Sequence, residues 1–471
     1  MANRQNGWQR NIMADYSDLD MAIAVLRVKT DRYTELYKYY EGRQPLVYSS
    51  ERLKDVFNDL NARFTQNWCA VVVDSVQDRL ALQSINVVDN DAPTAQLNDL
   101  LTNSDLLLEA DDVHNAVLVT GEAYVIAWPD EMTNQPEAFC NDPRNVHIFY
   151  EADNPRRKRF AAKWWIGDDD HRYITLYYPD RFEYYRSLNT VRNRSDGLPT
   201  AGTEVQNGKA FGDPATANND WGIVPVFHFR RDRQRTRGEL ENIIQPQDAV
   251  NKLLADMMVA AEFGAYKQRW IISDADTSKM KNGPNLIWNI PAGDGEMQPT
   301  SVGEFDITPL DNYLKAVDKW VTSIAIISRT PKHYFYGQGG DPSGEALIAL
   351  EAPLNKKVQA YIDHFLPTWS ELGVFMLRLL NVTVDDNAVV PVYDKPETVQ
   401  PLTRAMIRKT NVDAGVPLMW QLKDEGYTDE ELADVQAAKD EAMQQQQETL
   451  AAAMTNAQRN FDQGPNNNQS A

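Results

Sequence analysis

A helical pattern of nearly forty residues, 343–380, constrains the fold of this chain more than any other feature. Its apolar side chains recur at intervals of three and four residues, which places them on one face of an α-helix. They are Leu347, Leu350, Leu354, Val358, Tyr361, Ile362, Phe365, Trp369, Leu372 and Leu379. Pro353 and Pro367 interrupt the pattern and are expected to bend the helix. A second helical pattern at 309–328 precedes it, so two long helices must find partners in any fold that this chain adopts.

Residues 330–342 form a glycine-rich loop between these two helical patterns. Three glycines, Gly337, Gly339 and Gly340, allow backbone angles that other residues avoid. Ser343 can accept a hydrogen bond from a free amide at the start of the following helix. A flexible, partly aromatic loop between long helices suits a part that moves against a large partner better than a rigid pocket.

Spacing excludes three enzyme motifs. The loop is not a phosphate-binding P-loop, because no Gly-Lys-Ser/Thr follows its glycines. The sequence Gly340-Asp-Pro-Ser343-Gly places the serine one residue too late for a nucleophile elbow. The glycines also miss the dinucleotide fingerprint, since a helix rather than a strand precedes them. Residues 202–210 have five residues between glycines where a P-loop needs four, and are interpreted as a loop.

The 471-residue chain carries 68 acidic and 47 basic residues, a formal charge of −21. Gripping a phosphate backbone over the whole surface needs clustered Lys and Arg, so the balance argues against that mode of binding. It is compatible with a wall past which DNA slides, and equally with a charge that only aids solubility. No apolar run approaches the ~20 residues of a membrane span, and the first residues are too polar for a signal peptide.

No metal site or cofactor is expected. The six histidines, at positions 114, 147, 171, 228, 333 and 364, lack a ligand spacing. The acidic residues 168–170 could bind a cation, but an acidic turn is the better interpretation.

The first 235 residues predict helices followed by strands. Helical patterns occupy 1–45, 51–63 and 67–80. From about 117 to 235, short β-branched and aromatic stretches separated by turns predict an antiparallel, meander-like sheet, which residues 224–229 close. Residues 192–221 are rich in Gly, Asn and Asp and are expected to form a long exposed loop.

Helix returns at 238–264, where Pro246 is expected to kink the helix near its start. An insertion at 266–307 contains two strand-like pieces, 269–272 and 285–290. After residue 395 the pattern predicts short polar helices, including an acidic, Gln-rich helix from Thr428. Residues 463–471 read as a disordered tail.

Three segments, in this order and spacing, resemble the portal proteins of tailed bacteriophages, specifically those of long, non-contractile-tailed phages. The first is Tyr39-Tyr-Glu-Gly42 with Pro45-Leu46. The second runs from Asn67-Trp68 through Val73-Asp74 to Asp78-Arg79-Leu80. The third is Ser343-Gly-Glu-Ala346-Leu347 with Glu351 and Leu354. The resemblance covers about residues 1–380, and the region 395–471 fits it only by position and helicity.

The resemblance implies an α+β, portal-type fold with a strand-rich wing, a two-helix stem, a small α/β clip, a long kinked helix and a helical crown. The expected boundaries are 1–237 for the wing, 238–264 and 309–329 for the stem helices, 265–308 for the clip, 330–342 for the tunnel loop, 343–394 for the long helix and its return, and 395–462 for the crown.

A protein of this family is expected to act without catalysis and without cofactors, as a ring of twelve copies at one capsid vertex. Double-stranded DNA passes through the ring during packaging and ejection. The implied partners are the terminase large subunit, the head–tail adaptor, and the major capsid and scaffolding proteins, with no membrane. The expected location is the virion, after assembly in the host bacterial cytoplasm.

Three groups of candidate site residues follow. The DNA-facing tunnel loop comprises Lys332, His333, Tyr334, Gly337, Gln338, Gly339 and Gly340, while Tyr334, Phe335 and Tyr336 anchor the loop to the helices. The partner-binding clip comprises Trp270, Ile272, Lys279, Lys281 and Trp288. Residues 156–159 and 230–237 are basic runs that read naively as nucleic-acid patches. Pairing with acidic surfaces of neighbouring copies is the better reading for Arg230, Arg231, Arg233, Arg235 and Arg237.

Two alternatives come from other classes. A capsid-associated, metal-dependent nuclease would need a spaced Asp/Glu/Lys constellation after strands, which the sequence does not offer. Another ring component of the head–tail junction is disfavoured by length, because such chains are usually much shorter.

Overall fold

The computed structural model divides the chain into two compact units, Met1–Pro396 and Glu397–Ala471. It describes residues 17–45, 65–130, 135–193, 197–199, 210–265, 269–272, 301–306, 309–336, 344–396, 401–424, 427 and 429–462. The first unit is of the mixed α+β class that the sequence predicts. The helical piece expected at 51–63, the strand-like piece at 285–290, the loop glycines and the tail from 463 lie outside the described residues.

Two of the predicted helices begin at side-chain caps. In α2 (Asp18–Tyr40) the Ser17 hydroxyl accepts the Asp20 amide at 3.2 Å, and the Asp20 carboxylate accepts the Ser17 amide in return. In α4 (Trp68–Gln77) the side-chain oxygen of Asn67 accepts the Ala70 amide at 3.2 Å. The other α-helices among the described residues of this unit are α5 (Asp91–Asn103), α6 (Leu106–Thr120), α7 (Ile244–Ala265), α8 (Asp311–Ser328) and α9 (Gly344–Leu379).

The predicted antiparallel meander is confirmed as a five-stranded sheet in the order β4-β5-β6-β7-β8. Its strands are β4 (Val146–Tyr150), β5 (Lys158–Ile166), β6 (His171–Tyr177), β7 (Arg181–Thr190) and β8 (Ala215–Asn218). Strand β8 corrects part of the expected exposed loop, because it pairs with β7. Phe211, also in that region, is buried in a cluster with Ala22 and Leu26 of α2.

A separate three-stranded sheet has the order β3-β2-β9. It consists of β2 (Glu122–Pro129), β3 (Pro136–Asn141) and β9 (Val226–Arg230). The expectation that residues 224–229 close the meander is therefore wrong, since β9 pairs with β2. The reason is burial. Residues from Val226 to Phe229 are all buried, and Phe229 packs on Trp369 of α9 with ring centroids 4.7 Å apart, so β9 needs a covered position.

The end of α6 corrects two predicted boundaries. Residues 117–120, read as the start of strand, are the last turn of α6, which ends at Gly121 with φ +94°. Residues 238–243, read as helix, instead pack across this helix end, where the Glu239 amide donates to the Leu118 carbonyl at 2.7 Å. Helix α7 therefore begins at Ile244. Pro246 lies in its first turn, where amides have no intrahelical acceptor.

Strand β1 (Leu82–Val87) pairs with β12 (Val389–Tyr393), which lies close to the C-terminal end of the first unit. The strands are antiparallel, with Val87 opposite Val389. Helices α5 and α9 pack against this ribbon. The sequence pattern did not predict either strand.

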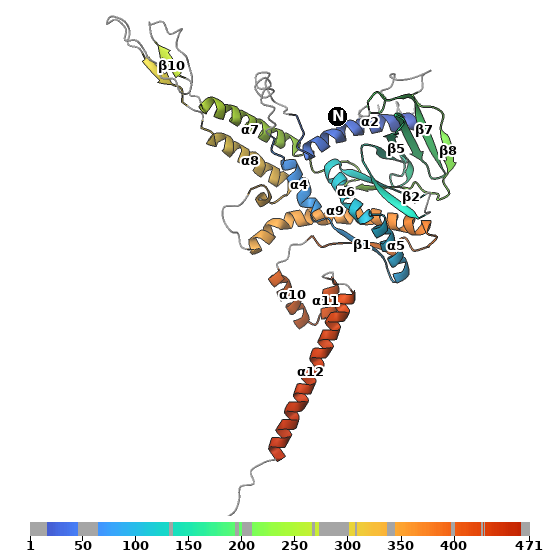
Figure 1. The fold of residues 1–471 in the computed structure, drawn as a ribbon, viewed down its shortest axis with the longest axis vertical. Helices are drawn as coiled ribbons and strands as arrows, with labels where there is room; N and C mark the ends of the chain where they lie inside the picture. The colour runs from blue at the N-terminus through green and yellow to red at the C-terminus, as the bar shows by residue number, and fades with distance from the viewer. Residues whose placement is uncertain are drawn as a thin grey trace, which may run out of the picture. The chain divides into compact units, whose positions relative to one another are not determined.

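Helices α7 and α8 lie side by side and project together from the body of the unit (Figure 1). At their far end, β10 (Arg269–Ile272) pairs antiparallel with β11 (Ser301–Glu304). The predicted strand at 269–272 is thus confirmed. Helix α9 follows α8 in the chain and is a single 36-residue helix that contains both Pro353 and Pro367.

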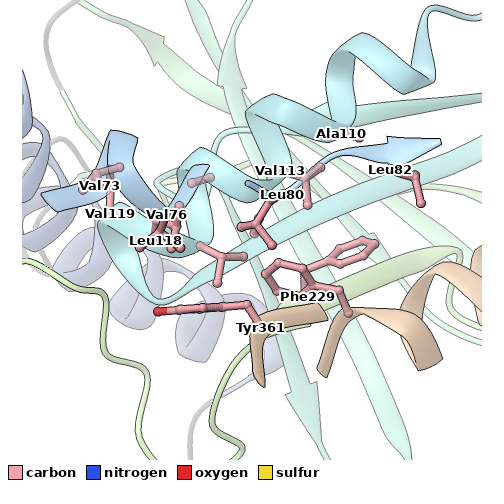
Figure 2. Close-up of a cluster of buried hydrophobic side chains, with 14 of the residues drawn as sticks. Val73, Val76, Leu80, Leu82, Ala110, Val113, Leu118, Val119, Phe229 and Tyr361 are labelled. Atoms are coloured by element: carbon pink, nitrogen blue, oxygen red, sulfur yellow. The ribbon is translucent and has the colours of Figure 1, made fainter. Parts of the chain in front are cut away.

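The main core joins the N-terminal helices, the three-stranded sheet and α9. Figure 2 shows its centre, where side chains of α4 and α6 meet Phe229 and Tyr361. The buried set reaches Val317, Val321 and Ile324 of α8, so the base of the projecting helix pair belongs to the same core.

The second unit is helical where it is described. It contains α10 (Pro401–Asp413), α11 (Leu418–Asp424) and α12 (Asp429–Asp462). The Gln-rich helix predicted from Thr428 is confirmed as α12, whose 34 residues make it far longer than its two neighbours.

Candidate functional site

The first two segments that carry the portal resemblance are in contact. The Asn67 side chain donates to the Tyr40 carbonyl at 2.6 Å, so the residue that caps α4 also holds the end of α2. The Tyr40 hydroxyl donates to the Asp74 carboxylate at 2.9 Å. Burial is the main cause that raises the pKa of Asp74, and the Tyr40 hydrogen bond opposes it.

The second and third segments meet through Arg79. Its guanidinium lies 3.3 Å from the Glu351 carboxylate on α9, and donates to the Tyr334 hydroxyl at 2.8 Å. The His333 imidazole lies 3.7 Å from the other oxygen of Glu351. The second and third family segments therefore meet at the turn that leaves α8, and the first segment contacts the second.

That turn is fixed by the backbone. Arg329, with φ +56°, ends α8, and the Thr330 amide reaches back to the Ala325 carbonyl at 3.0 Å. A short 3-10 helix, η2 (Lys332–Tyr334), follows. The glycines of the predicted tunnel loop, Gly337, Gly339 and Gly340, and its Gln338 lie outside the described residues.

Aromatic side chains hold the described part of the loop against α4. Phe335 is buried, and the Trp68 ring lies 5.5 Å from Phe335 and 5.8 Å from Tyr336 between centroids. The anchoring predicted for residues 334–336 is confirmed. Lys332 is the exposed cation of this segment, and its ammonium pairs with Asp318 of α8 at 3.1 Å. Both partners are about half exposed, so this pair is weak and can exchange for another anion.

A buried polar cluster centred on Glu239 ties the same turn to α9. Glu239 accepts from the Lys357 ammonium at 3.1 Å and from the Tyr361 hydroxyl at 2.7 Å. Lys357 also donates to the Ser328 carbonyl at 2.7 Å, satisfying the last turn of α8. Burial lowers the pKa of Lys357, and Glu239 opposes that shift.

Some arginines of the run 230–237 contact partners in the same chain, and others are exposed to solvent. Arg231 pairs with Glu239 at 3.1 Å and stacks on Tyr361. Arg237 pairs with Glu241 at 3.4 Å. Arg230 lies over the Tyr150 ring at 4.7 Å, while Arg233 and Arg235 are exposed. Contact with neighbouring copies stays a prediction for this run.

The predicted clip is described only in part. Trp270 lies opposite Gly303 in the β10–β11 pair and covers it so closely that a Cβ there would stand 2.4 Å from the indole. Ile272, on the same strand, is 68% exposed. Lys279, Lys281 and Trp288 lie outside the described residues.

Comparison with protein families decides the identity. The family model described as phage portal protein, SPP1 Gp6-like, matches residues 23–452. The chain belongs to this phage portal protein family. The resemblance drawn from the three segments is thereby confirmed. The match spans the converging segments, both projecting helices and most of the second unit. No curated protein matches the chain.

Sequence reasoning on this portal-family chain missed a buried cluster around Glu122. The Glu122 carboxylate pairs with Lys29 at 2.6 Å, accepts from the Tyr33 and Tyr124 hydroxyls at 2.5 and 2.9 Å, and lies 3.0 Å from the His228 imidazole. Burial opposes ionisation, but Lys29 and His228 hold the pKa of Glu122 well below its usual range. With every group paired, the cluster joins α2, β2 and β9.

A signal for this cluster was present in the sequence. Lys29 occupies a position between Leu26 and Tyr33 on the buried face of α2, where the spacing calls for an apolar residue. A lysine on such a stripe needs a buried carboxylate, and only the fold reveals that Glu122 supplies it.

Two further features bear on function. Within the described ranges, no three His, Cys, Asp or Glu side chains are grouped so that they could hold a metal ion. None of the helices in the part of the portal chain that the structure describes is long and apolar enough to cross a membrane.

Proposed function

We propose that this chain is the subunit of a ring that forms the DNA portal of a tailed-phage capsid. The family match over residues 23–452 carries the proposal. In the proposed assembly, twelve copies surround a channel at one capsid vertex. Double-stranded DNA enters through it during packaging and leaves through it at ejection. The terminase large subunit docks first and the head–tail adaptor later, while capsid and scaffolding proteins contact the outside.

The projecting helix pair supports the stem assignment. Helix α8 buries one face in its own chain through Val317, Val321 and Ile324. It also exposes large apolar side chains, with Ile326 at 73%. A helix that lines a ring must pack on its own chain and on the next copy, so exposed apolar residues are expected there. These exposed side chains are Leu314, Trp320, Ile326 and Ile327.

The position of the loop supports its role in the channel. The described part is held at its base by Arg79, Trp68 and the Glu239 cluster, and it follows directly from the stem. Lys332, weakly paired with Asp318, can exchange that carboxylate for a passing phosphate. One such cation in each copy gives contacts that form and release as DNA moves.

The strand pair at the tip of α7 and α8 supports the clip assignment. It is too small to build a core of its own, and Ile272, Val302 and Phe305 are exposed there. Docking of the terminase and then of the adaptor at this tip would cover these side chains.

Electron microscopy of the purified full-length protein tests the proposal. Closed rings with a central hole are the expected result. A strictly monomeric protein at all concentrations and salt conditions would contradict it. The proposed role is structural rather than enzymatic, and a magnesium-dependent nuclease assay on the same preparation tests the alternative directly.

A further inference from the structure

The two basic runs of the sequence meet at one pocket. The cavity has a volume of about 550 Å³ and lies beside α9 in the first unit. The run 156–159 contributes Arg156 and Lys158, and the run 230–237 contributes Arg230 and Arg233. Helix α9 contributes Asp363 and Glu371. We call this the basic pocket.

The cations of the basic pocket outnumber its carboxylates. Lys158 and Glu371 form an ion pair at 2.6 Å and neutralise each other. Asp363 accepts a hydrogen bond from Gln359 at 2.9 Å. The guanidinium groups of Arg156, Arg230 and Arg233 form no ion pair within the described part of the chain. Three guanidinium groups that form no ion pair, of which Arg230 stacks on Tyr150, thus face one carboxylate in a protein whose overall charge is −21.

The floor of the basic pocket is already satisfied. His228 faces it, with one imidazole nitrogen on Glu122 at 3.0 Å and the other accepting from the Tyr150 hydroxyl at 3.0 Å. Burial is the main cause that lowers the pKa of His228 to about 4, and the charge of Arg230 adds to it. The positive charge that forms no ion pair therefore lies on Arg230, which stacks on Tyr150, and on the exposed Arg156 and Arg233 at the pocket mouth.

We propose that the basic pocket receives a carboxylate side chain from a second copy of this chain. Guanidinium groups can match carboxylates with paired hydrogen bonds. Two arginines of the same run already form ion pairs within the chain, Arg231 with Glu239 and Arg237 with Glu241. A net charge of −21 means that a neighbouring copy presents many carboxylates. A cavity of this volume holds a side chain but not a duplex. The inference rests on the proposed ring.

The test compares two single variants of the full-length protein. Arg233→Glu places a carboxylate at the pocket mouth. Arg192→Glu changes the charge equally at another exposed position, which lies outside both basic runs and does not line the pocket. Ring assembly is measured by sedimentation velocity over a range of protein concentrations, after circular dichroism has shown that both variants are folded. The expected result is an association that is roughly tenfold weaker or more for Arg233→Glu only.

A cross-linking measurement identifies the partner. In Arg233→Lys, the substituted ammonium can be coupled to a touching carboxylate with a carbodiimide. With mixed isotope-labelled and unlabelled copies, mass spectrometry is expected to find cross-links between copies at position 233. Cross-links confined to one copy would overturn the proposal.

The outcomes separate this proposal from the proposed function. If the unsubstituted protein forms no rings, the proposed function fails. If it forms rings and both variants assemble equally well, the pocket proposal fails while the function stands. If Arg233→Glu assembles normally but loses affinity for a short DNA duplex relative to Arg192→Glu, the pocket binds phosphate and the proposal is overturned.

Discussion

Arg79 and Glu351 form an ion pair with a nitrogen-to-oxygen distance of 3.3 Å, and only 14% and 12% of their side chains are exposed. Arg79 follows α4 and Glu351 lies on α9, so the pair joins these two helical segments beside the turn that leaves α8. Because Arg79 also binds the Tyr334 hydroxyl, one guanidinium links two helical segments and the base of the loop.

Removing Arg79 should therefore destabilise the body. Arg79→Met leaves Glu351 without its main counter-charge in a nearly buried site, and is expected to lower the free energy of unfolding by about 2–4 kcal/mol. Chemical denaturation of the full chain measures this. Arg43→Met, which breaks the exposed pair with Glu41, is the control and should cost at most about 1 kcal/mol. Equal losses in both variants would contradict the structural role of Arg79.

Gly121 should tolerate no side chain. Its φ is +94°, and a Cβ would stand 2.5 Å from the Arg237 backbone nitrogen. Gly121→Ala should thus cost more than the ~1 kcal/mol expected from left-handed backbone strain alone. Gly222→Ala separates the two effects, because Gly222 has φ +69° with open space around it. In thermal unfolding, the melting temperature of Gly121→Ala should lie well below that of Gly222→Ala. Equal melting temperatures would argue against the close contact.

Stability should fall as the pH drops below 6.5. Burial lowers the pKa of His114 to about 3, so the unfolded chain binds a proton that the folded chain rejects between pH 6.5 and about 3. The contribution of the neutral His114 to the free energy of unfolding is fully present above pH 6.5 and is lost as the pH falls through this window. Burial also lowers the pKa values of His147 and His228, so these two residues act in the same direction.

The His114→Gln variant isolates one of these contributions. It should reduce the slope of unfolding free energy against pH by up to roughly 1.4 kcal/mol per pH unit between pH 6 and 5. Tyr393→Phe removes the hydroxyl 2.8 Å from the imidazole but keeps the buried His114. This control should lose stability at every pH while the slope persists. An unchanged slope in His114→Gln would count against the buried neutral imidazole.

Lys332 and Asp318 should have opposite effects on DNA binding by the assembled ring. Lys332→Gln removes the exposed cation and should weaken binding of a short duplex severalfold, with a shallower salt dependence. Asp318→Asn frees the same ammonium and should strengthen binding. Lys319→Gln is the control, because it removes another exposed lysine, one that lies on α8. Fluorescence anisotropy over a salt series measures all three, and equal affinities for Lys332→Gln and Lys319→Gln would contradict a DNA-facing Lys332.

The sequence predicted those elements whose pattern is set locally. Helices α8 and α9 carry long apolar stripes at helical spacing, and the meander strands alternate between clear turn signals. Val117 and Val119 suggested a strand because β-branched side chains favour strands, whereas here they end a buried helix against Arg237 and Gly238. No local pattern could place β9, since its partner β2 lies about a hundred residues earlier.

The candidate site was predictable to a similar extent. The aromatic anchors at 334–336 and the arginine run stand out in composition alone. The sequence could not identify their partners, because contacts between distant segments produce no local pattern. These partners are Arg79, Trp68 and Glu239. The basic pocket follows the same rule, since two runs far apart in sequence share it only after folding.

The pairing of β1 with β12 has a consequence for synthesis on the ribosome. Residues 82–87 leave the exit tunnel long before residues 389–393 exist. At the usual elongation rates of about 5–20 residues per second, roughly 15–60 s pass before the closing strand emerges. During that interval the nascent polypeptide carries β1 with an unpaired edge and with the apolar side chains of Leu82, Ile85 and Val87. Slower expression at low temperature with chaperone support should therefore raise the yield of native subunits.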